Sequence, residues 1–421
     1  MLRARLQVGA AVLVLGFALG CSTSPGPSAT PGPTATTPPP TASPAPHPTA
    51  SATTSPAPTT SPPTATPPPL PAPLFTISAL IPVLDGPAVP TAADLDADGD
   101  MDVALPGDSW VSILLNDGSG NFSDPVTMDV LHGAEILVAA DFTGDGKVDL
   151  ALSADDNLAV FTGKGDGTFR QPPDYYPTSS DRDPETGNAN WIDAGDLDGD
   201  GDLDLTIAYY GSNLPIPSAP GHLAVFINSG TAGFEPAVYY DCLACTAVVM
   251  ADFDDDGATD AVSTEFNATA TFWRGSADGT LAPGTPFRTG GRSAAIVAED
   301  MNGDGHLDLF IGNDHDFTSS VLLGAGDGSF GEPLVLAAGN THSISIADLN
   351  ADGQVDLLSG NDAFVHVWLD DGSGGLAVTE GIRVNDLDVG GVAAADFNGD
   401  GRQDLALSMG GTTLAILLGG G

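Results

Sequence analysis

The stretch DLDGDGDLD, residues 196–204, contains five carboxylates in nine positions, in a chain that is only 16% charged overall. Its spacing, D-x-[DN]-x-[DN]-G-x-x-D, is typical of a short loop in which alternate side chains point inward and a glycine permits a sharp turn. Calcium takes six to eight oxygen ligands at about 2.3 to 2.6 Å. We therefore predict that this loop binds Ca²⁺. Asp196, Asp198 and Asp200 would supply side-chain oxygens, Asp202 its backbone carbonyl and Asp204 the closing carboxylate.

Two other interpretations of the loop are weaker. The EF-hand loop starts in the same way, but it closes with glutamate at its twelfth position and lies between two helices. Here the closing acid is at position nine and the flanking segments have the pattern of strands, which excludes an EF-hand. An isolated Asp-Gly turn is usually only a hairpin, but this unit is not isolated.

The same nine-residue unit occurs seven times, and successive copies start 47, 55, 56, 48, 48 and 48 residues apart. The copies are DLDADGDMD (94–102), DFTGDGKVD (141–149), DLDGDGDLD (196–204), DFDDDGATD (252–260), DMNGDGHLD (300–308), DLNADGQVD (348–356) and DFNGDGRQD (396–404). Repetition at such a period indicates a repeat architecture.

The segments around each copy have the length and composition of β-strands. Each copy lies between short apolar runs, such as GVAAA (391–395) and LALSM (405–409), and an alternating run with a Gly-rich turn follows, as in VSILLNDGSGNF (111–122). Runs of four to six residues bounded by Gly, Asp and Asn are typical of strands and tight turns. Four strands in each of seven repeats predict an all-β, seven-bladed β-propeller over residues 74–421.

The two ends of this region are complementary. LAILLGGG (414–421) matches the third strand of a blade and stops where other repeats continue into a fourth strand, while FTISALIPV (75–83) matches that missing strand. We predict that the N-terminal strand pairs beside Leu414–Leu418 and closes the ring, which removes an open sheet edge.

The repeated unit resembles that of the FG-GAP and VCBS repeat propellers, a family that includes the blades of integrin α-subunits. The resemblance covers residues 74–421 and implies one Ca²⁺ per blade, up to seven in all, between the first and second strands. The implied ligands are positions 1, 3, 5 and 9 and the carbonyl of position 7: Asp94, Asp96, Asp98, Asp100, Asp102, Asp141, Thr143, Asp145, Lys147, Asp149, Asp196, Asp198, Asp200, Asp202, Asp204, Asp252, Asp254, Asp256, Ala258, Asp260, Asp300, Asn302, Asp304, His306, Asp308, Asp348, Asn350, Asp352, Gln354, Asp356, Asp396, Asn398, Asp400, Arg402 and Asp404.

The negative charge of these loops predicts that bound metal contributes to the stability of the fold. Thr143 stands where the second loop needs Asp or Asn, so we expect that site to bind calcium most weakly. Seven ions would add +14 and bring the formal net charge from −45 to −31. Without metal, each pair of like charges in a loop costs about 1 to 4 kcal/mol. Calcium is therefore expected to raise the melting temperature.

Composition excludes some functions. The chain has 56 acidic and 11 basic side chains, which disfavours nucleic acid as a partner. At 42% hydrophobic residues it can bury a sizeable core, but it has no apolar run long enough for a spanning helix. The acidic residues lie at fixed places between apolar runs, which argues against disorder.

Residues 1–21 are expected to be a secretory signal peptide, and the residues after them a tether. Arg3 and Arg5 precede an apolar stretch, and residues 18–21, ALGC, resemble a bacterial lipobox in which Cys21 is lipidated, although Ala18 departs from the commoner Leu. Ordinary secretion is the alternative. Residues 22–73 are rich in Pro, Thr and Ser and predict a disordered stalk that could reach roughly 160 Å. We expect an exported, membrane-anchored, monomeric lipoprotein facing the periplasm or cell surface.

Cys242 and Cys245, in DCLAC, are compatible with a redox pair, half of a metal site or a small disulfide. A disulfide is the ordinary outcome in an exported protein. The Gly-rich stretches GKGDG (163–167) and GAGDG (324–328) open no helix, which favours strand-to-strand turns over phosphate-binding loops.

The two long repeat intervals contain the insertions 174–191 and 209–221. In a propeller, links between blades and links from the second to the third strand emerge on one face, opposite the calcium loops. We predict a ligand site there because Tyr and Trp suit protein and sugar contacts. The alternative is that the tyrosine pairs pack on outer strands. The predicted ligand residues are Tyr175, Tyr176, Trp191, Tyr209, Tyr210, Tyr239 and Tyr240.

Two classes of function follow from this pattern. The favoured one is a non-catalytic adhesion or binding module for a protein or glycan, which the family resemblance also implies. The alternative is a propeller enzyme acting on polysaccharide as a lyase or hydrolase. The sequence shows no Ser/His/Asp or paired-carboxylate arrangement, because nearly every suitable Asp has a metal role.

Overall fold

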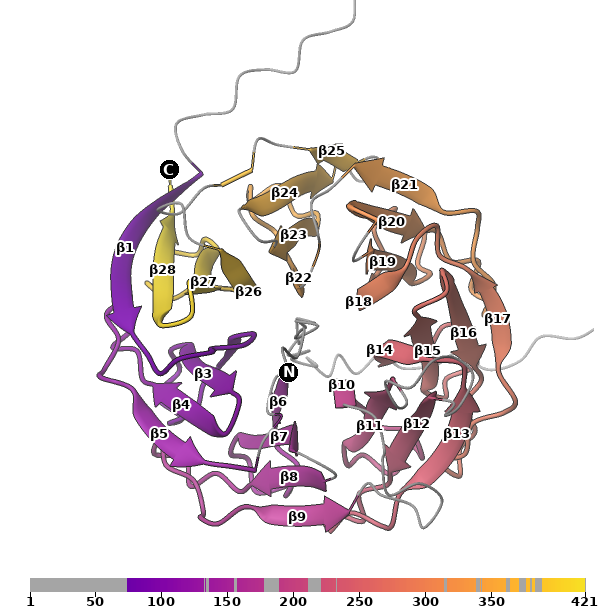
Figure 1. The fold of residues 1–421 in the computed structure, drawn as a ribbon, viewed down its shortest axis with the longest axis horizontal. Helices are drawn as coiled ribbons and strands as arrows, with labels where there is room; N and C mark the ends of the chain where they lie inside the picture. The colour runs from indigo at the N-terminus through magenta and orange to yellow at the C-terminus, as the bar shows by residue number, and fades with distance from the viewer. Residues whose placement is uncertain are drawn as a thin grey trace, which may run out of the picture. The chain divides into compact units, whose positions relative to one another are not determined.

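A computed structural model describes residues 74–420 except 132, 134–135, 155–156, 178–188, 211–220, 232, 314–315, 338–340, 342, 361–363, 371–375, 379–380 and 383–387. The described residues form 28 strands in seven four-stranded antiparallel sheets, arranged as a ring of blades (Figure 1). This confirms the predicted seven-bladed β-propeller. The described part of the chain has no helix with the length and apolarity to cross a membrane. The predicted signal, Cys21 and the linker lie outside the described residues.

Blades one to six each use four consecutive strands, ordered from the centre outward. Blade one has β2 (Thr91–Ala93), β3 (Asp102–Gly107), β4 (Trp110–Leu114) and β5 (Val126–Asp129). Blade two has β6 (Leu137–Ala140), β7 (Asp149–Ala154), β8 (Asn157–Phe161) and β9 (Asp174–Pro177). Blade three has β10 (Ala189–Gly195), β11 (Asp204–Tyr209), β12 (Gly221–Phe226) and β13 (Val238–Cys242).

The second half of the ring repeats this order. Blade four has β14 (Cys245–Ala251), β15 (Asp260–Glu265), β16 (Thr269–Trp273) and β17 (Thr285–Arg288). Blade five has β18 (Ser293–Glu299), β19 (Asp308–Asn313), β20 (Thr318–Leu322) and β21 (Leu334–Ala337). Blade six has β22 (Ser343–Ala347), β23 (Asp356–Gly360), β24 (Val365–Asp370) and β25 (Leu376–Val378).

Blade seven joins the two ends of the propeller. It contains β26 (Val389–Ala395), β27 (Asp404–Met409), β28 (Thr413–Gly419) and, as its outer strand, β1 (Phe75–Pro82). β1 pairs antiparallel with β28 from Phe75 opposite Gly419 to Pro82 opposite Thr413, and Figure 1 shows the two strands side by side. The predicted closure of the ring by the N-terminal strand is confirmed.

The core lies between the blades, because their sheets pack face to face. Second strands such as β15 and β19 are buried at every position, whereas outer strands such as β17 and β21 are largely exposed. A strand covered on both faces needs a continuous apolar run instead of strict alternation. This explains the LALS and LFIG type runs after each acidic unit.

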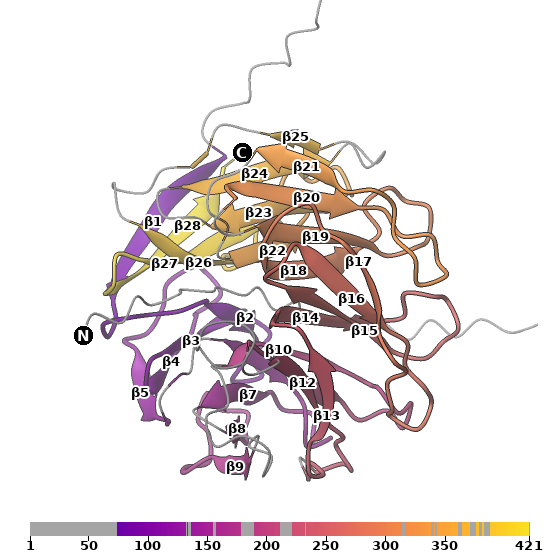
Figure 2. The same cartoon turned by 45° about the vertical axis from the view of Figure 1, so that its right-hand side comes forward.

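Successive strands of a blade run in opposite directions, so their connections emerge on two distinct faces of the propeller. The path of the strands can be followed in Figure 2. Every nine-residue unit connects a first strand to a second strand, and its closing aspartate is the first residue of the second strand. These loops and the third-to-fourth turns emerge on one face, named here the metal-loop face. The second-to-third turns and the links between blades emerge on the other, named here the opposite face.

Candidate functional site

The loop of blade five shows how the repeated unit folds. Asp300 accepts backbone N–H groups of Asp304 at 3.1 Å and Gly305 at 2.9 Å. Asn302 Oδ1 also accepts the Asp304 N–H at 2.9 Å, and Asp304 Oδ1 accepts the His306 N–H at 3.0 Å. These short-range bonds hold the side chains of positions 1, 3 and 5 against the backbone of the loop. The loops of blades six and seven repeat the same pattern.

The glycine at position 6 is required by backbone conformation. Its φ is positive in all seven loops, for example 91° at Gly305 and 98° at Gly201. A Cβ built at either glycine would meet no atom within 4 Å, so space is not the restriction. Residues with side chains rarely adopt this left-handed region, which is why the loop depends on glycine here.

The closing aspartate of each loop is fully buried and joins three parts of its blade. In blade five, Asp308 Oδ2 accepts the Met301 N–H at 3.1 Å, and Oδ1 accepts the Gly324 N–H at 2.8 Å. The second bond ties the metal loop to the end of the third strand. Equivalent pairs of bonds occur in the other six blades.

Burial of these closing carboxylates disfavours their charged form. Desolvation is the largest cause, and the two backbone N–H groups oppose it only in part. The pKa is raised in all seven. It is raised to about 6 in Asp102, Asp204, Asp260, Asp308 and Asp356, and also above its ordinary value in Asp149 and Asp404.

Three of the described loops bring carboxylate oxygens close together, as a hard cation requires. In blades one, three and four the acids at positions 1, 3 and 9 each bring one ligand atom within 4.8 Å of the others. The other four loops carry Asn or Thr at position 3 in place of the second acid. In blade four, Asp252 Oδ1 is buried and has no hydrogen-bond partner among the described residues. All-oxygen donor sets of this kind fit calcium.

The loop of blade two differs from the rest in the way the sequence indicates. Thr143 Oγ1 donates to Asp141 at 3.3 Å, and the Lys147 ammonium lies 2.8 Å from Asp145 Oδ2. At position 3 this loop therefore has a hydroxyl group where the other loops have a carboxylate or an amide oxygen, and a cation lies against the carboxylate of position 5. The weaker calcium binding expected of this loop stays a prediction.

Adjacent blades hold each other's metal loops. In blade one, Asn116 Nδ2 donates to the Phe397 carbonyl of the blade-seven loop at 2.7 Å. In blade three, Asn228 Nδ2 donates to the Phe142 carbonyl of the blade-two loop at 2.9 Å. The conformation of a metal loop is thus linked to packing between blades.

The predicted tyrosine and tryptophan site requires correction. Trp191 and Tyr209 are 2% and 0% exposed, and Tyr209 stacks on His222 with ring centroids 4.7 Å apart. They belong to the core, because inner and second strands are covered on both faces, and cannot contact a ligand there.

The other tyrosines divide between packing and surface. Tyr176 and Tyr240 make edge contacts with Phe234 and Trp273, and Tyr239 contacts His222. Tyr175 is 36% exposed on β9, and Tyr210 is half-buried after β11. The alternative that tyrosine pairs pack on strands thus holds for Tyr176, Tyr239 and Tyr240.

The insertions are also shorter than predicted. Residues 174–177 form the outer strand of blade two, and 189–191 belong to the inner strand of blade three. Of the two predicted insertions, residues 178–188 and 211–220 lie outside the described residues.

Tyr210 belongs to a group of side chains on the opposite face that the sequence analysis missed. Its ring makes an edge contact with Phe266 at 5.6 Å, and the Arg292 guanidinium lies 5.4 Å from the centre of the Phe266 ring. Arg292 also pairs with Asp316 at 3.7 Å, beside Phe317, which is 61% exposed.

These residues define a surface across three blades. We name the set Tyr210, Leu243, Phe266, Arg292 and Phe317 the opposite-face patch. Leu243 is 71% exposed, and its neighbour Ala244 accepts the Phe266 N–H at 3.2 Å. A signal for Phe266 and Phe317 was present, because each follows a second strand and all second-to-third turns emerge on this face.

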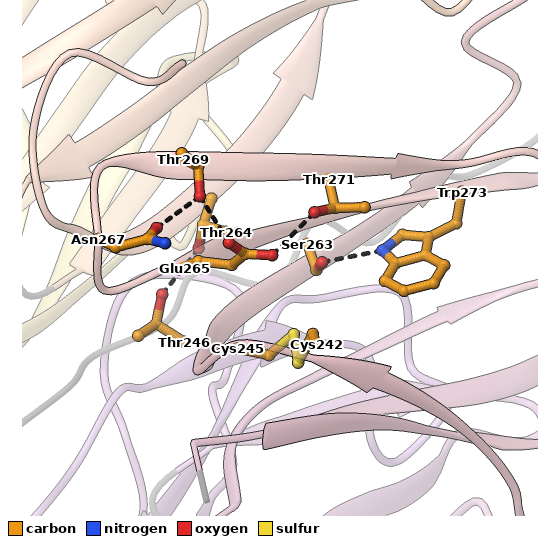
Figure 3. Close-up of a disulfide and its surroundings, with 10 residues drawn as sticks. All are labelled: Cys242, Cys245, Thr246, Ser263, Thr264, Glu265, Asn267, Thr269, Thr271 and Trp273. Atoms are coloured by element: carbon orange, nitrogen blue, oxygen red, sulfur yellow. Dashed lines mark hydrogen bonds between the residues drawn. A yellow bond between two sulfur atoms is a disulfide. The ribbon is translucent and has the colours of Figure 1, made fainter. Parts of the chain in front are cut away.

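A disulfide, drawn in Figure 3, closes the short turn that carries Leu243 of the patch. Cys242, the last residue of β13, and Cys245, the first of β14, are bonded in the structure and link blades three and four. Beside them, the buried Glu265 accepts the hydroxyl groups of Thr269 at 2.5 Å and Thr271 at 2.8 Å. Hydrogen bonds therefore hold the turn that carries Phe266, both through Glu265 and through the Phe266 N–H, which donates to Ala244 inside the disulfide-closed turn.

The chain belongs to the FG-GAP-like repeat family. The family model matches residues 94–152, 141–207, 252–311, 300–359 and 348–407, which together cover more than half of the chain. No curated protein matches the sequence.

Solved structures share the fold. The BBS1N chain from a crystal structure of BBS1N with ARL6DN has a TM-score of 0.59 and 10% identity, over 82% of this chain and 97% of that one. A lectin of Agrocybe aegerita, described as specifically recognising non-reducing terminal N-acetylglucosamine, has a TM-score of 0.54 and 18% identity, over 80% of this chain and 86% of the lectin. At these identities the likeness concerns the fold.

Proposed function

We propose that this protein is a calcium-stabilised, non-catalytic binding module that recognises a protein or glycan ligand through the opposite-face patch. The observation that carries the proposal is the division of the propeller into two faces. One face bears seven acidic loops of a single design, and the other presents exposed apolar side chains beside an arginine held over an aromatic ring.

Calcium would be held by the oxygens of positions 1, 3, 5 and 9 and the carbonyl of position 7. The three-carboxylate clusters of blades one, three and four and the buried, unpartnered Asp252 Oδ1 support this assignment among the described residues. Bound calcium would supply positive charge at the point where the loop concentrates acids. Since the loops also touch adjacent blades, we expect the metal to stabilise the ring as a whole.

The ligand proposal rests on the chemistry of the patch. Exposed Phe and Leu side chains and a half-buried Tyr supply contact area, and the Arg292–Asp316 pair offers hydrogen-bonding groups at its edge. Aromatic rings with adjacent polar groups suit sugars as well as protein surfaces. Because a lectin shares the fold, a glycan is the first class of ligand to test. Lipidation of Cys21 would tether the binding module to a membrane through the linker of residues 22–73.

The test is a glycan array combined with a polysaccharide degradation screen. We expect binding to be lost in Tyr210→Ala and Phe317→Ala with little change in melting temperature, since both side chains reach the surface. Val126→Ala is the matched control, because Val126 is an exposed apolar residue of blade one, 62% exposed and outside the patch. A ligand footprint on the metal-loop face would contradict the patch, and release of oligosaccharides would replace the binding module with an enzyme.

A further inference from the structure

Arg274 lies against two predicted calcium ligands of its own blade. Its guanidinium forms an ion pair with Asp254, at position 3 of the blade-four loop, and a second one with Asp256, at position 5, at 3.2 Å. The Asp254 side chain is buried, while Arg274 is half exposed. The positive charge of one side chain thus lies beside both carboxylates.

The same position is not basic in any other blade. Arg274 directly precedes Gly275, whose N–H binds the closing aspartate of blade four. The corresponding bonds identify the equivalent residues in the other blades. These are Leu115, Thr162, Ile227, Leu323, Leu369 and Leu418. Arginine at this position is therefore particular to blade four.

Packing explains why blade four tolerates arginine at a position that is apolar or Thr in the other blades. Leu115 covers Gly167 of the next blade, since a Cβ on that glycine would lie 2.6 Å from the leucine. The glycine of blade five that faces blade four in the equivalent place is Gly328, and Phe272 of blade four covers it, since a Cβ there would lie 2.4 Å from the phenylalanine ring. Arg274 is thus free of the packing role and can turn to the loop.

The blade-four loop is as rich in aspartate as the loops of blades one and three. Position 4 is Asp255, where the other loops have Gly or Ala, so the loop holds five aspartates. Asp255 Oδ2 lies 2.8 Å from His306 Nδ1 in the blade-five loop. Counting acids alone would place this loop among the strongest calcium sites, and its three-carboxylate cluster agrees with that ranking. Arg274 reverses this expectation, because its positive charge repels a divalent cation.

We propose that Arg274 acts as a built-in cation for the blade-four loop, so that this loop keeps its conformation without a divalent ion and binds calcium more weakly than the loops of blades one and three. This inference rests on the proposed calcium role of the loops. The chemistry it requires is simple: the guanidinium neutralises the carboxylates of positions 3 and 5 that a metal would otherwise neutralise.

The test compares Arg274→Gln with Arg274→Lys and the unaltered chain. Native mass spectrometry and titration calorimetry with CaCl₂ would show the blade-four site about tenfold tighter in Arg274→Gln, because one unit charge within a few ångströms of the metal is removed. Arg274→Lys keeps the charge and should resemble the unaltered protein. The gain must disappear when Asp252→Asn is added, which assigns it to blade four. Unchanged or weaker calcium binding in Arg274→Gln would overturn the inference.

Melting temperatures in EDTA provide a readout that does not require bound metal. Arg274→Gln should melt several degrees lower than the unaltered chain in EDTA and at the same temperature in saturating CaCl₂. Leu323→Arg in blade five is the converse variant and should lose one tight site. If neither the unaltered chain nor Arg274→Gln binds calcium, the proposed calcium role of the loops is wrong. The melting temperatures in EDTA then decide the role of Arg274 by themselves, and equal values for the two proteins would reject it.

Discussion

Asp193 should make the stability of the propeller depend on pH. Its carboxylate lies on β10, the inner strand of blade three, and accepts the Met250 N–H of β14 in blade four at 2.7 Å. Burial raises the pKa of Asp193 to about 7, against an ordinary value of 3.8, and the backbone N–H groups lower it only in part. The perturbation is Asp193→Asn, which retains an oxygen for the Met250 N–H and removes the charge.

The sign follows from which state binds the proton more tightly. The folded protein does, so protonation of Asp193 favours folding, and the unaltered chain loses stability as pH rises from about 4 to about 7. Asparagine does not titrate, so the stability of Asp193→Asn relative to the unaltered chain should grow with pH. With the pKa values above, the difference in unfolding free energy should widen by about 2 to 3 kcal/mol between pH 5 and pH 8.

The assay is urea unfolding followed by circular dichroism at pH 5 and pH 8, in saturating CaCl₂. The closing aspartates of the loops are common to both proteins, so their titration cancels in the difference. Asp117→Asn is the control: hydrogen bonds from Ser119 and Asn121 lower the pKa of Asp117, so its titration is complete below pH 5 and its effect should be equal at both values. A constant difference between Asp193→Asn and the unaltered chain would refute the reasoning.

Two further predictions concern ring closure and metal binding. Phe75→Ala should destabilise the protein by about 3 to 5 kcal/mol, because Phe75 anchors β1 in the blade-seven core, whereas Leu80→Ala, on the exposed side of the same strand, should have little effect on the urea midpoint. Equal midpoints would argue against closure by β1. In calorimetry with CaCl₂, Asp304→Ala should lower affinity and melting temperature more than Asp145→Ala, whose loop already carries Thr143 in place of Asp or Asn; equal losses would count against assigning ligands from the spacing.

Local features could be predicted from the sequence because their interactions join residues close together in the chain. The loop of blade five is closed by hydrogen bonds across two to seven residues, so the spacing of Asp300, Asp304 and Asp308 contains the geometry. The number of repeated units then gives the number of blades, and the unmatched strands at the two ends indicate how the ring closes. These steps need only periodicity and the need to pair exposed edges.

Other properties arise from contacts between distant residues and only the tertiary structure decided them. Trp191 and Tyr209 are residue types that are common in binding sites, yet face-to-face packing of the blades buries both side chains. Arg274 lies twenty positions after Asp254 in the chain, and the hairpin of β15 and β16 brings their side chains together. Asp193 meets the Met250 N–H only because the inner strands of blades three and four are adjacent. Burial and charge at a residue depend on all its spatial neighbours, and a pattern along the chain contains only the nearest of them.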